Sequence, residues 1–438
     1  MMEAFVYIIY NSAIFLLSPL LVLYFFSRSW QRGRSLVGMA ERLGRVRHLP
    51  PAKAGGRLWL HAVSVGEVGV AAILVPEILK RCPHLRIVIS TVTDTGREEA
   101  MKIDGVEYVF YLPFDFPFSV RSALERICPT AMAIVETELW PNLVWHAARR
   151  GLPVCIVNGR LSENSFRGYL RVRPLFFSVL GKLVGVAARG EADAIRYRAL
   201  GASGVFAAGN VKFDVPAAHV VDDPEHLKEK FGLGGADPII VAGSTHPGEE
   251  EALARAICTL RERFGRLGVL VAPRHLPRLA DAEEALRRGG VDPVRWSELK
   301  DKTAVGQEGG QVVLLDTMGQ LGEAYECATV AFIGGSIVPH GGQNPIEAAR
   351  WGVPVIFGRH MQNFSEVAGG LIEVGGAFRV ERPEDLAEAF LPLLSDTSAR
   401  TAAGASAWKS VMANRGAAGR VADYLVEMLK TSRNDQNA

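Results

Sequence analysis

Beyond residue 50 the chain alternates short apolar runs, rich in Val and Ile, with longer stretches in which apolar residues recur at helical spacing. Runs of about four to eight such residues are typical of strands buried on both faces, and helices between them are typical of a parallel sheet. We therefore expect strands at 58–62, 87–91, 106–112, 131–135, 154–158, 184–188 and 205–208 in the first half, and at 239–242, 269–272, 312–315, 330–333 and 355–357 in the second.

A polar, charged segment at 216–237 interrupts this pattern and predicts a linker. The chain has 438 residues, more than one ordinary core contains. The sequence thus predicts an α/β protein with two Rossmann-like, doubly wound domains facing a central cleft, in which ligands bind beyond the carboxyl ends of the strands. The expected divisions are a membrane anchor at 1–30, an N-terminal domain at 31–220, a C-terminal domain at 236–415, and a C-terminal helix with a disordered tail at 416–438.

Residues 4–26 are mostly apolar and long enough, at about 1.5 Å per residue, to cross a bilayer core of about 30 Å. We expect a membrane anchor here, either spanning or deeply interfacial. A signal peptide fits poorly, because no basic stretch precedes the run and no small-residue cleavage site follows it. Polar residues and a proline inside the run (Asn11, Ser18 and Pro19) leave open a buried or interfacial helix.

Basic residues follow the anchor and outnumber the nearby Glu41. By the positive-inside rule they predict that the body of the protein lies on the cytoplasmic side of the membrane. They could bind anionic lipid headgroups or be solvated charges, and the sequence leaves both open. These residues are Arg28, Arg32, Arg34, Arg42, Arg45 and Arg47.

Composition excludes several other classes of protein. The net charge of +2 gives no global footprint for nucleic acid, so no nucleic-acid partner is expected. The five cysteines are scattered and form no Cys-x-x-Cys pair, which argues against a disulfide framework or a zinc site. They indicate reduced thiols in a reducing compartment.

Three motifs of the first half end at or near candidate strands and place charged residues there. Glu67 closes the segment 61–67 and would lie in the first turn of a helix, as a general base or as a partner of the helix dipole. Glu136 begins the segment 136–142, as a substrate-orienting acid or as part of a helix cap. Lys212 lies near the linker, and it could neutralise an anion or pair with Asp214.

The second half carries motifs suited to a nucleotide. Small residues at 242–250 and 334–336 would let backbone N–H groups approach an anion. Arg274 can fork to a phosphate, and the segment 316–321 offers groups for a base or ribose.

The segment 340–347 is the most specific of these. Asn344 is a good helix N-cap with Pro345 at the first helical position, so the helix dipole would face a phosphate. Glu347 would be either a capping-box partner or an acceptor for ribose hydroxyls.

Taken in this order and spacing, the motifs resemble those of the 3-deoxy-D-manno-octulosonic acid (Kdo) transferases of lipopolysaccharide assembly, over almost the whole chain. The resemblance implies a GT-B fold and an inverting transfer of Kdo from CMP-Kdo to the lipid A precursor lipid IVA, at the inner membrane and without a metal. It implies a catalytic base at Glu67 and transition-state stabilisers at Glu136 and Lys212. The implied CMP-contacting positions are Pro273, Arg274, Met318, Gly319, Gln320, Asn344, Pro345, Ile346 and Glu347.

One position departs from the family pattern: Gln320 stands where a Glu is often found, which puts only a side-chain role there in doubt. Two alternatives are a GT-B transferase that moves a UDP-sugar to a lipid-linked acceptor, and a membrane-tethered binding module without catalysis. Retention of Glu67 beside the segment 340–347 argues against the binding module.

Overall fold

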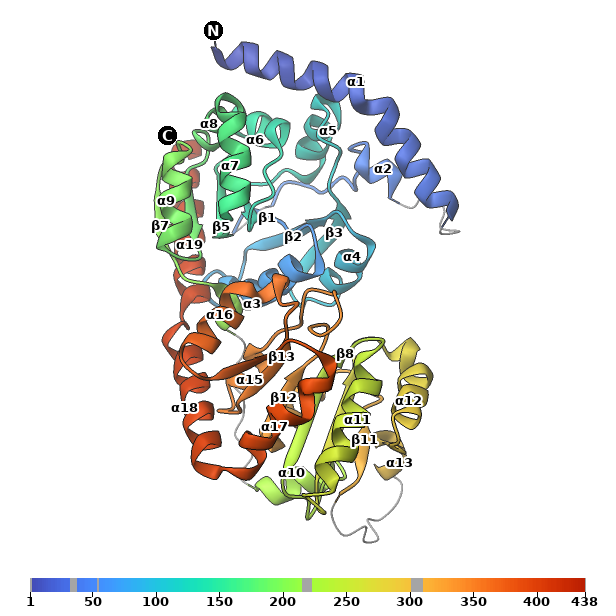
Figure 1. Ribbon diagram of the computed structural model, residues 1–438. Helices are drawn as coiled ribbons and strands as arrows, with labels where there is room; N and C mark the ends of the chain where they lie inside the picture. Colours follow the sequence, from blue (N-terminus) through green and yellow to red (C-terminus); the bar gives the residue numbers. More distant parts are fainter. Residues whose placement is uncertain (1, 32–37, 53–54, 215–222, 301–309, 438) are drawn as a thin grey trace. The chain divides into compact units, whose positions relative to one another are not determined.

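The computed structural model describes residues 2–31, 38–52, 55–214, 223–300 and 310–437, except for the side chains of residues 2, 4, 20–31, 300 and 432–437 (Figure 1). The chain forms two compact units, Met1–Asp214 with Arg415–Ala438, and Val215–Asn414. Three of the predicted basic residues, Arg28, Arg32 and Arg34, lie outside the described side chains, as does part of the predicted linker.

The first unit is built on a parallel sheet of seven strands in the order β3-β2-β1-β4-β5-β6-β7. Each strand predicted in this half is present, with its ends shifted by at most one residue. The strands are β1 (Arg57–His61), β2 (Arg86–Thr91), β3 (Val106–Tyr111), β4 (Ala131–Val135), β5 (Val154–Gly159), β6 (Gly185–Ala188) and β7 (Val205–Ala207).

Alternate side chains of these strands enter two separate cores, because successive residues of a strand point to opposite faces. On one face Trp59, Met132 and Ile134 pack with α5, α6, α8 and α9, and on the other Leu58 and Leu60 pack with α3 and α19. The helices of this unit besides α1 are α2 (Met39–Arg42), α3 (Val65–Arg81), α4 (Asp94–Ala100), α5 (Pro117–Ile127), α6 (Pro141–Ala148), α7 (Glu163–Arg171), α8 (Arg173–Leu180), α9 (Glu191–Ala199) and α19 (Ala417–Asn437).

The predicted N-terminal apolar segment is helical: α1 (Met2–Gln31) lies beside α8 and contacts α6 through side chains (Figure 1). Within the part of the chain whose side chains are described, no helix combines the length and the hydropathy of a membrane span. Arg42, one of the basic residues that the sequence places after the anchor, is buried. It donates to the Val92 carbonyl at 2.7 Å and lies over the Tyr111 ring.

The chain returns to its first unit at the end. Ala417, Val421 and Leu425 of α19 are fully buried in the core beside α3. The helix continues to Asn437, through most of the segment after Leu429 that the sequence predicts as a polar tail. A run of apolar residues at helical spacing ends at Leu429, and the sequence pattern beyond it gave no sign of a longer helix.

The second unit repeats the architecture in a parallel sheet ordered β10-β11-β9-β8-β12-β13-β14. The five predicted strands are present, and β10 and β14 were not predicted. The strands are β8 (Ile239–Thr245), β9 (Gly268–Pro273), β10 (Val294–Arg295), β11 (Val312–Leu314), β12 (Val330–Ile333), β13 (Val355–Gly358) and β14 (Ala377–Val380).

Helices cover this second sheet as well, and α11, α12 and α17 pack with the core on one of its faces. The longest of the set, α18, contacts α15, α16 and α17. The helices are α10 (Pro224–Lys230), α11 (Glu249–Arg261), α12 (Leu279–Arg288), α13 (Trp296–Lys300), α14 (Leu321–Ala324), α15 (Ile346–Ala349), α16 (Ser365–Glu373), α17 (Leu386–Ser395) and α18 (Thr397–Ala413).

Candidate active site

The strand order of the first unit reverses between β1 and β4, which are hydrogen-bonded neighbours at the centre of the sheet. In open α/β sheets the chain leaves such a pair of strands in opposite directions, and ligands bind in the crevice beyond their carboxyl ends. Glu67 lies in the first turn of α3, directly after β1, and Glu136 directly follows β4. The topology therefore brings these two predicted acids to one place.

The Glu67 carboxylate is buried, with 8% of the residue exposed. One oxygen, Oε2, accepts from the backbone N–H of Val63 at 2.8 Å, and Oε1 accepts from the Ser64 hydroxyl at 3.2 Å. Burial raises the pKa of Glu67 to about 8, with a further increase from the charges of Glu136 and Glu138. A carboxyl group with such a pKa can both take and return a proton near neutral pH, as general-base catalysis requires.

Lys212 pairs with Glu136, not with the alternative partner Asp214. Its Nζ lies 2.9 Å from Glu136 Oε1, and the two side chains are 14% and 15% exposed. Asp214 instead accepts from the backbone N–H groups of Gly416 and Ala418, at 2.5 and 2.6 Å, at the start of α19. The first unit thus gathers two acids and a cation on the segments that follow its strands.

Backbone geometry fixes both partners of this pair. Glu136 has a φ of 61°, a left-handed conformation that is rare outside glycine and that clusters at functional sites. Lys212 lies in the short 3-10 helix Val211–Phe213, where Asn158 accepts from the Val211 N–H at 2.9 Å and Asn210 accepts from the Lys212 N–H at 3.1 Å. The side chains that hold this turn come from two different strand ends.

In the second unit the strand order reverses between β8 and β12, and the predicted small-residue segments follow these two strands. The expectation that 334–336 presents free N–H groups to a ligand anion is wrong. The buried Glu249 carboxylate accepts from the N–H groups of Gly335 at 2.7 Å, Ser336 at 2.9 Å and Ile337 at 3.0 Å, and also from that of His246 at 2.9 Å. An internal carboxylate therefore occupies this anion site.

The segment 341–347 keeps the predicted cap and leads into a short helix. Asn344 Oδ1 accepts from the Ile346 N–H at 3.1 Å, and Ala349 N–H donates to the Pro345 carbonyl at 3.1 Å, as in a capped first turn. Because α15 spans only Ile346–Ala349, its dipole is smaller than that of a long helix. Anion binding here has to rely on local N–H groups and side chains.

Glu347 is half-buried, and Asn344 Nδ2 lies 3.4 Å from its Oε1. Burial raises the pKa of Glu347, opposed by the charges of Arg350 and Arg274 and by the Asn344 contact. The Arg274 charge is therefore close enough to lower the pKa of Glu347. The Arg274 backbone N–H donates to the Thr245 carbonyl at 3.0 Å, next to Pro273 at the end of β9. This places Arg274 and the segment 344–347 in one electrostatic neighbourhood.

The predicted segment 318–320 follows β11 and precedes α14. Met318 is exposed, and Gly319 has a φ of 87°, which favours glycine. The Gln320 carbonyl accepts from the Ala324 N–H at 3.0 Å at the start of α14, a backbone role that does not depend on the side chain. Trp351, which follows α15, donates its Nε1 hydrogen to the Gly322 carbonyl of α14 at 2.7 Å. This hydrogen bond links the two segments.

A histidine cluster that sequence reasoning did not assign lies in the second unit. The His246 ring stacks on that of His340, with centroids 4.3 Å apart, and meets His275 edge-on at 6.0 Å. Burial, with the nearby histidines, Arg278 and Arg274, lowers the pKa of His246 to about 4. Each histidine follows a strand of this sheet. That shared position is the sequence signal from which their proximity could have been predicted. Over the described ranges, no group of three or more His, Cys, Asp or Glu side chains is arranged to hold a metal ion.

Comparison with known proteins identifies the family. A 3-deoxy-D-manno-octulosonic acid transferase of Haemophilus influenzae is 32% identical over 432 residues, which cover 96% of this chain and 98% of that protein. The chain belongs to the Kdo transferase family. A transferase of the same name from Bordetella pertussis is also 32% identical, over 96% of this chain and 99% of its own. A family model described as 3-Deoxy-D-manno-octulosonic-acid transferase matches residues 38–215.

Solved structures show the same fold at low sequence identity. A glycosyltransferase from Rickettsia africae is 16% identical, with a TM-score of 0.54 over 87% of this chain and 99% of that one. A UDP-GlcNAc 2-epimerase from Neisseria meningitidis is 13% identical, with a TM-score of 0.54 over 86% and 100%. The predicted GT-B fold of two Rossmann-like domains is confirmed, and this Kdo transferase is a glycosyltransferase.

Proposed function

We propose that this Kdo transferase moves Kdo from CMP-Kdo to a hydroxyl group of the lipid A precursor lipid IVA, with inversion and without a metal ion, in lipopolysaccharide biosynthesis. Its place of action is the cytoplasmic side of the inner membrane, with α1 as the anchor. The observation that carries the proposal is the buried Glu67 at the strand-order reversal of the first unit, beside the Glu136–Lys212 pair. The names of the relatives supply the transferred sugar.

In the proposed reaction, Glu67 takes the proton of the acceptor hydroxyl as its oxygen attacks the anomeric carbon of Kdo. The bond between that carbon and the phosphate oxygen breaks, and its electron pair leaves with CMP. General-base help of this kind contributes about 10² to 10⁴ in rate. Lys212 offsets negative charge that develops in the transition state, and Glu136 holds the Lys212 ammonium at 2.9 Å.

The second unit is proposed to bind the nucleotide. Arg274 would fork to the phosphate, the segment 344–347 would hold phosphate and ribose, and the segment 318–320 would contact the base. Arg274→Ala should weaken CMP binding by about tenfold or more, because a charge-assisted contact to phosphate is lost. Calorimetric titration with CMP measures this, with the exposed Arg379→Ala of β14 as control. Equal CMP affinity in the Arg274 variant would refute this assignment.

One reaction tests donor, acceptor and product together. Purified full-length protein is incubated with CMP-Kdo and lipid IVA in mixed micelles, and the lipid is weighed by mass spectrometry. The proposal expects a mass increase of one or more Kdo units, unchanged by EDTA. It also expects thermal protection by CMP and none by UDP. Transfer only from a UDP-sugar, or loss of transfer in EDTA, would contradict it.

A further inference from the structure

The faces of α1 are reversed relative to an ordinary surface helix. The side chains that face the folded unit include Val6 and the hydrogen-bonding Tyr7, Tyr10 and Asn11, while the outward side is apolar. A helix on a water-exposed surface buries its apolar stripe and exposes its polar one. The outward residues are Phe5, Ile8, Ile9, Phe15, Leu16 and Leu17, each at least half exposed and Leu16 80% exposed.

Polar contacts hold the inward side firmly. The Tyr10 hydroxyl donates to Asp115 Oδ2 at 2.7 Å, and Asp115 also accepts from two backbone N–H groups at the start of α6. The Asn11 and Asn142 amides exchange hydrogen bonds at 2.9 and 3.2 Å. Because Asp115 and Asn142 are buried, removing α1 would leave them without these partners. The first turns of α1 are thus part of the fold.

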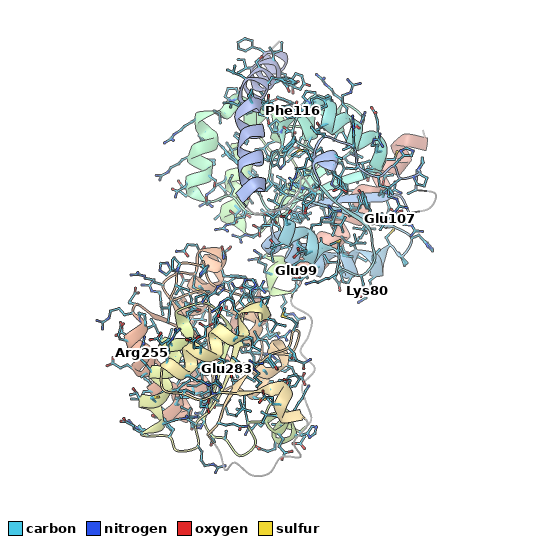
Figure 2. All side chains as sticks on the ribbon, turned by 90° about the vertical axis from the view of Figure 1, so that its right-hand side faces the viewer. Lys80, Glu99, Glu107, Phe116, Arg255 and Glu283 are labelled. Atoms are coloured by element: carbon cyan, nitrogen blue, oxygen red, sulfur yellow. The ribbon has the colours of Figure 1, made fainter. Side chains whose placement is uncertain are left out.

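The apolar surface continues beyond α1. The Phe15 ring lies 5.5 Å from that of Phe116, and Phe116 stacks on Phe118 at 5.5 Å (Figure 2 labels Phe116). Phe118, in the first turn of α5, is 54% exposed. An apolar surface shared by two elements and exposed to this extent marks an interaction site.

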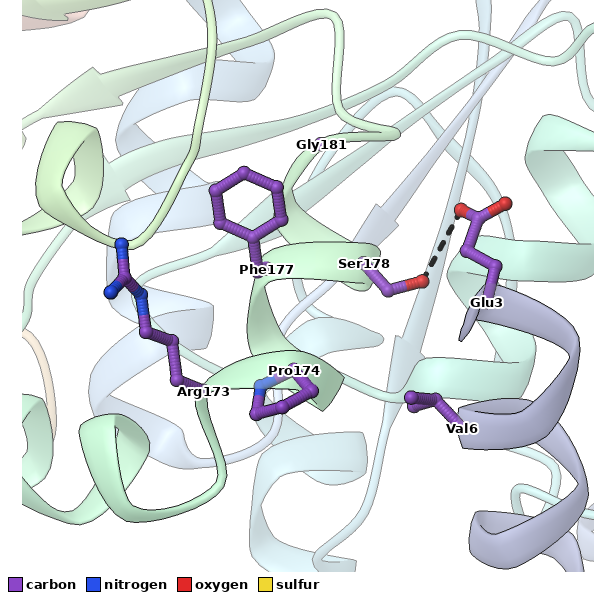
Figure 3. A pocket seen from close by; sticks show the side chains of 7 residues that line it. All are labelled: Glu3, Val6, Arg173, Pro174, Phe177, Ser178 and Gly181. Carbon is purple, nitrogen blue, oxygen red and sulfur yellow. Dashed lines mark hydrogen bonds between the residues drawn. The ribbon is translucent and has the colours of Figure 1, made fainter. Parts of the chain in front are cut away.

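A cavity of about 570 Å³ opens between α1 and α8, at the end of this surface (Figure 3). Val6, Pro174 and Phe177 line it with apolar side chains, and Arg173 and Glu3 add charged side chains to the lining. Its volume falls in the range of about 300 to 1,000 Å³ that small-molecule sites have. Glu3 is already paired, with Lys182 Nζ at 2.6 Å and the Ser178 hydroxyl at 3.3 Å.

The charges around the apolar surface are mainly basic. Arg149 lies over the Tyr7 ring at 5.1 Å, and Arg121, Arg149 and Arg150 all act on His146, which contacts Tyr7. The nearby Glu125 is paired with Arg150 at 2.6 Å. Apolar side chains surrounded by arginines match an anionic bilayer, whose interior is apolar and whose headgroups carry phosphate.

We propose that α1 lies in the plane of an anionic membrane, and that the cavity between α1 and α8 takes one acyl chain of a bilayer phospholipid with Arg173 at its phosphate. Spanning would require the first turns of α1 to leave Asp115 and Asn142. This inference deepens the membrane part of the proposed function. Its tests use no sugar transfer, so it can fail while Kdo transfer stands.

The first test is cross-linking to a phosphatidylglycerol that carries a diazirine near the end of one acyl chain. Full-length protein is bound to vesicles that contain this lipid, irradiated and digested. The label should concentrate in the tryptic peptide 172–182 and in the N-terminal peptide, and Val6→Trp and Phe177→Asp, on opposite walls, should each reduce it at least fivefold. The matched control is Ile195→Asp on α9, an exposed apolar residue on another surface.

Circular dichroism and CMP affinity establish that the variants fold. If one wall variant does not fold, the other still tests the cavity. Label spread evenly over the chain, or label that neither wall variant reduces, would overturn the acyl-chain site. Labelling of an Arg173→Gln variant equal to that of the unaltered protein would overturn the role of Arg173.

The second test measures depth. A nitrobenzoxadiazole group is attached to a cysteine at position 9 or 16, in a background without native cysteines, and quenched by lipids brominated at different depths. The in-plane helix predicts the same shallow depth at both positions. A spanning helix predicts a difference of about 10 Å, from seven residues at about 1.5 Å each, and that result would refute the in-plane orientation.

Discussion

At the scale of single residues, Glu67 combines two properties that oppose each other. Burial and the neighbouring acids favour its protonated form, while the two hydrogen bonds from Val63 and Ser64 favour the carboxylate. The pKa of about 8 shows that burial dominates. A Glu that only stabilised a helix start would be favoured by an ordinary pKa, because it would then stay charged beside the helix dipole. The raised pKa of Glu67 lowers the stability of the fold and fits a group that exchanges protons.

The raised pKa gives Glu67 a measurable pH dependence. The transfer rate should rise with pH through about 8 and then level off, because only the carboxylate can act as a base. Glu67→Gln should lower turnover by at least about 10² at every pH and remove this rise, with CMP affinity unchanged. Glu77→Gln, on the same helix, is the matched control. Turnover of the Glu67→Gln variant near that of wild type would rule out Glu67 as the base.

The same shift has a consequence for stability. Between the ordinary value of 4.5 and about 8 the folded protein holds a proton on Glu67 that the unfolded chain has lost, so the carboxyl group lowers stability as pH rises. A glutamine side chain has no such proton to lose. Glu67→Gln should therefore unfold at a higher temperature than wild type above pH 8, and the difference should vanish near pH 4.5. A difference independent of pH would show that the Glu67 pKa is not raised.

Lys212 can be tested for structural and chemical roles separately. Lys212→Met leaves the Glu136 carboxylate without its cation and should cost about 1 to 3 kcal/mol of stability, together with at least tenfold in turnover. Adding Glu136→Gln should restore much of the stability, because no buried charge remains unpaired, but not the turnover. Chemical denaturation and initial rates measure the two effects. Recovery of both would mean that Lys212 serves only to neutralise Glu136.

At the scale of elements, the loop after β12 depends on a carboxylate from α11. Glu249→Gln replaces an acceptor of four N–H groups with an amide whose own N–H₂ opposes some of them, and should cost about 2 to 4 kcal/mol in the second unit. Hydrogen exchange should rise at 334–337 and at the start of α11. Glu251→Gln, two residues on and paired with Arg255 at 2.6 Å on the helix surface, should change neither. Unaltered hydrogen exchange in the Glu249→Gln variant would show that the loop after β12 does not depend on the Glu249 carboxylate.

The elements also show what the sequence could predict. Strands buried on both faces, such as β4 and β12, have an unbroken apolar run, and their predicted bounds are those observed. The missed strands are sheet edges: β10 has two half-buried residues, and β14 exposes Phe378 and Arg379. An edge strand loses the apolar run that marks a central one, so periodicity could not separate it from a loop.

The candidate site was likewise predictable from the sequence only in part. The spacing of strands and motifs predicted that Glu67 and Glu136 follow strands, and the strand order made those strands neighbours. The ligand of the 335–337 N–H groups could not be predicted, because a glycine-rich segment shows only that N–H groups are accessible. Glu249 lies 86 residues before Gly335 in the chain, and their contact is a property of the sheet.

At the scale of the whole molecule, the first unit depends on the end of the chain. Asp214 caps the start of α19, Arg420 Nε donates to the Ala208 carbonyl at 2.8 Å, and Leu425 is buried in the core of this unit. Burying a side chain such as Leu425 contributes about 1.5 to 3 kcal/mol, and several α19 residues are buried to the same degree. Since a domain has only about 5 to 15 kcal/mol in total, the unit cannot keep its fold without this helix.

A chain that ends at Asn414 should therefore lose the fold of its first unit and keep that of its second, which contains its own sheet and ends at that residue. Hydrogen exchange should show protection lost across β1 to β7 and retained across β8 to β14. The matched control ends at Lys430, after Leu429, which is the last buried residue among the α19 side chains that the structure describes, and should melt within about one degree of the full chain. A protected first unit in the chain that ends at Asn414 would mean that α19 covers a core that is already complete. Because α19 follows the second unit in the chain, the first unit can finish folding only after the second has been synthesised, which reverses the usual order of folding from the N-terminus.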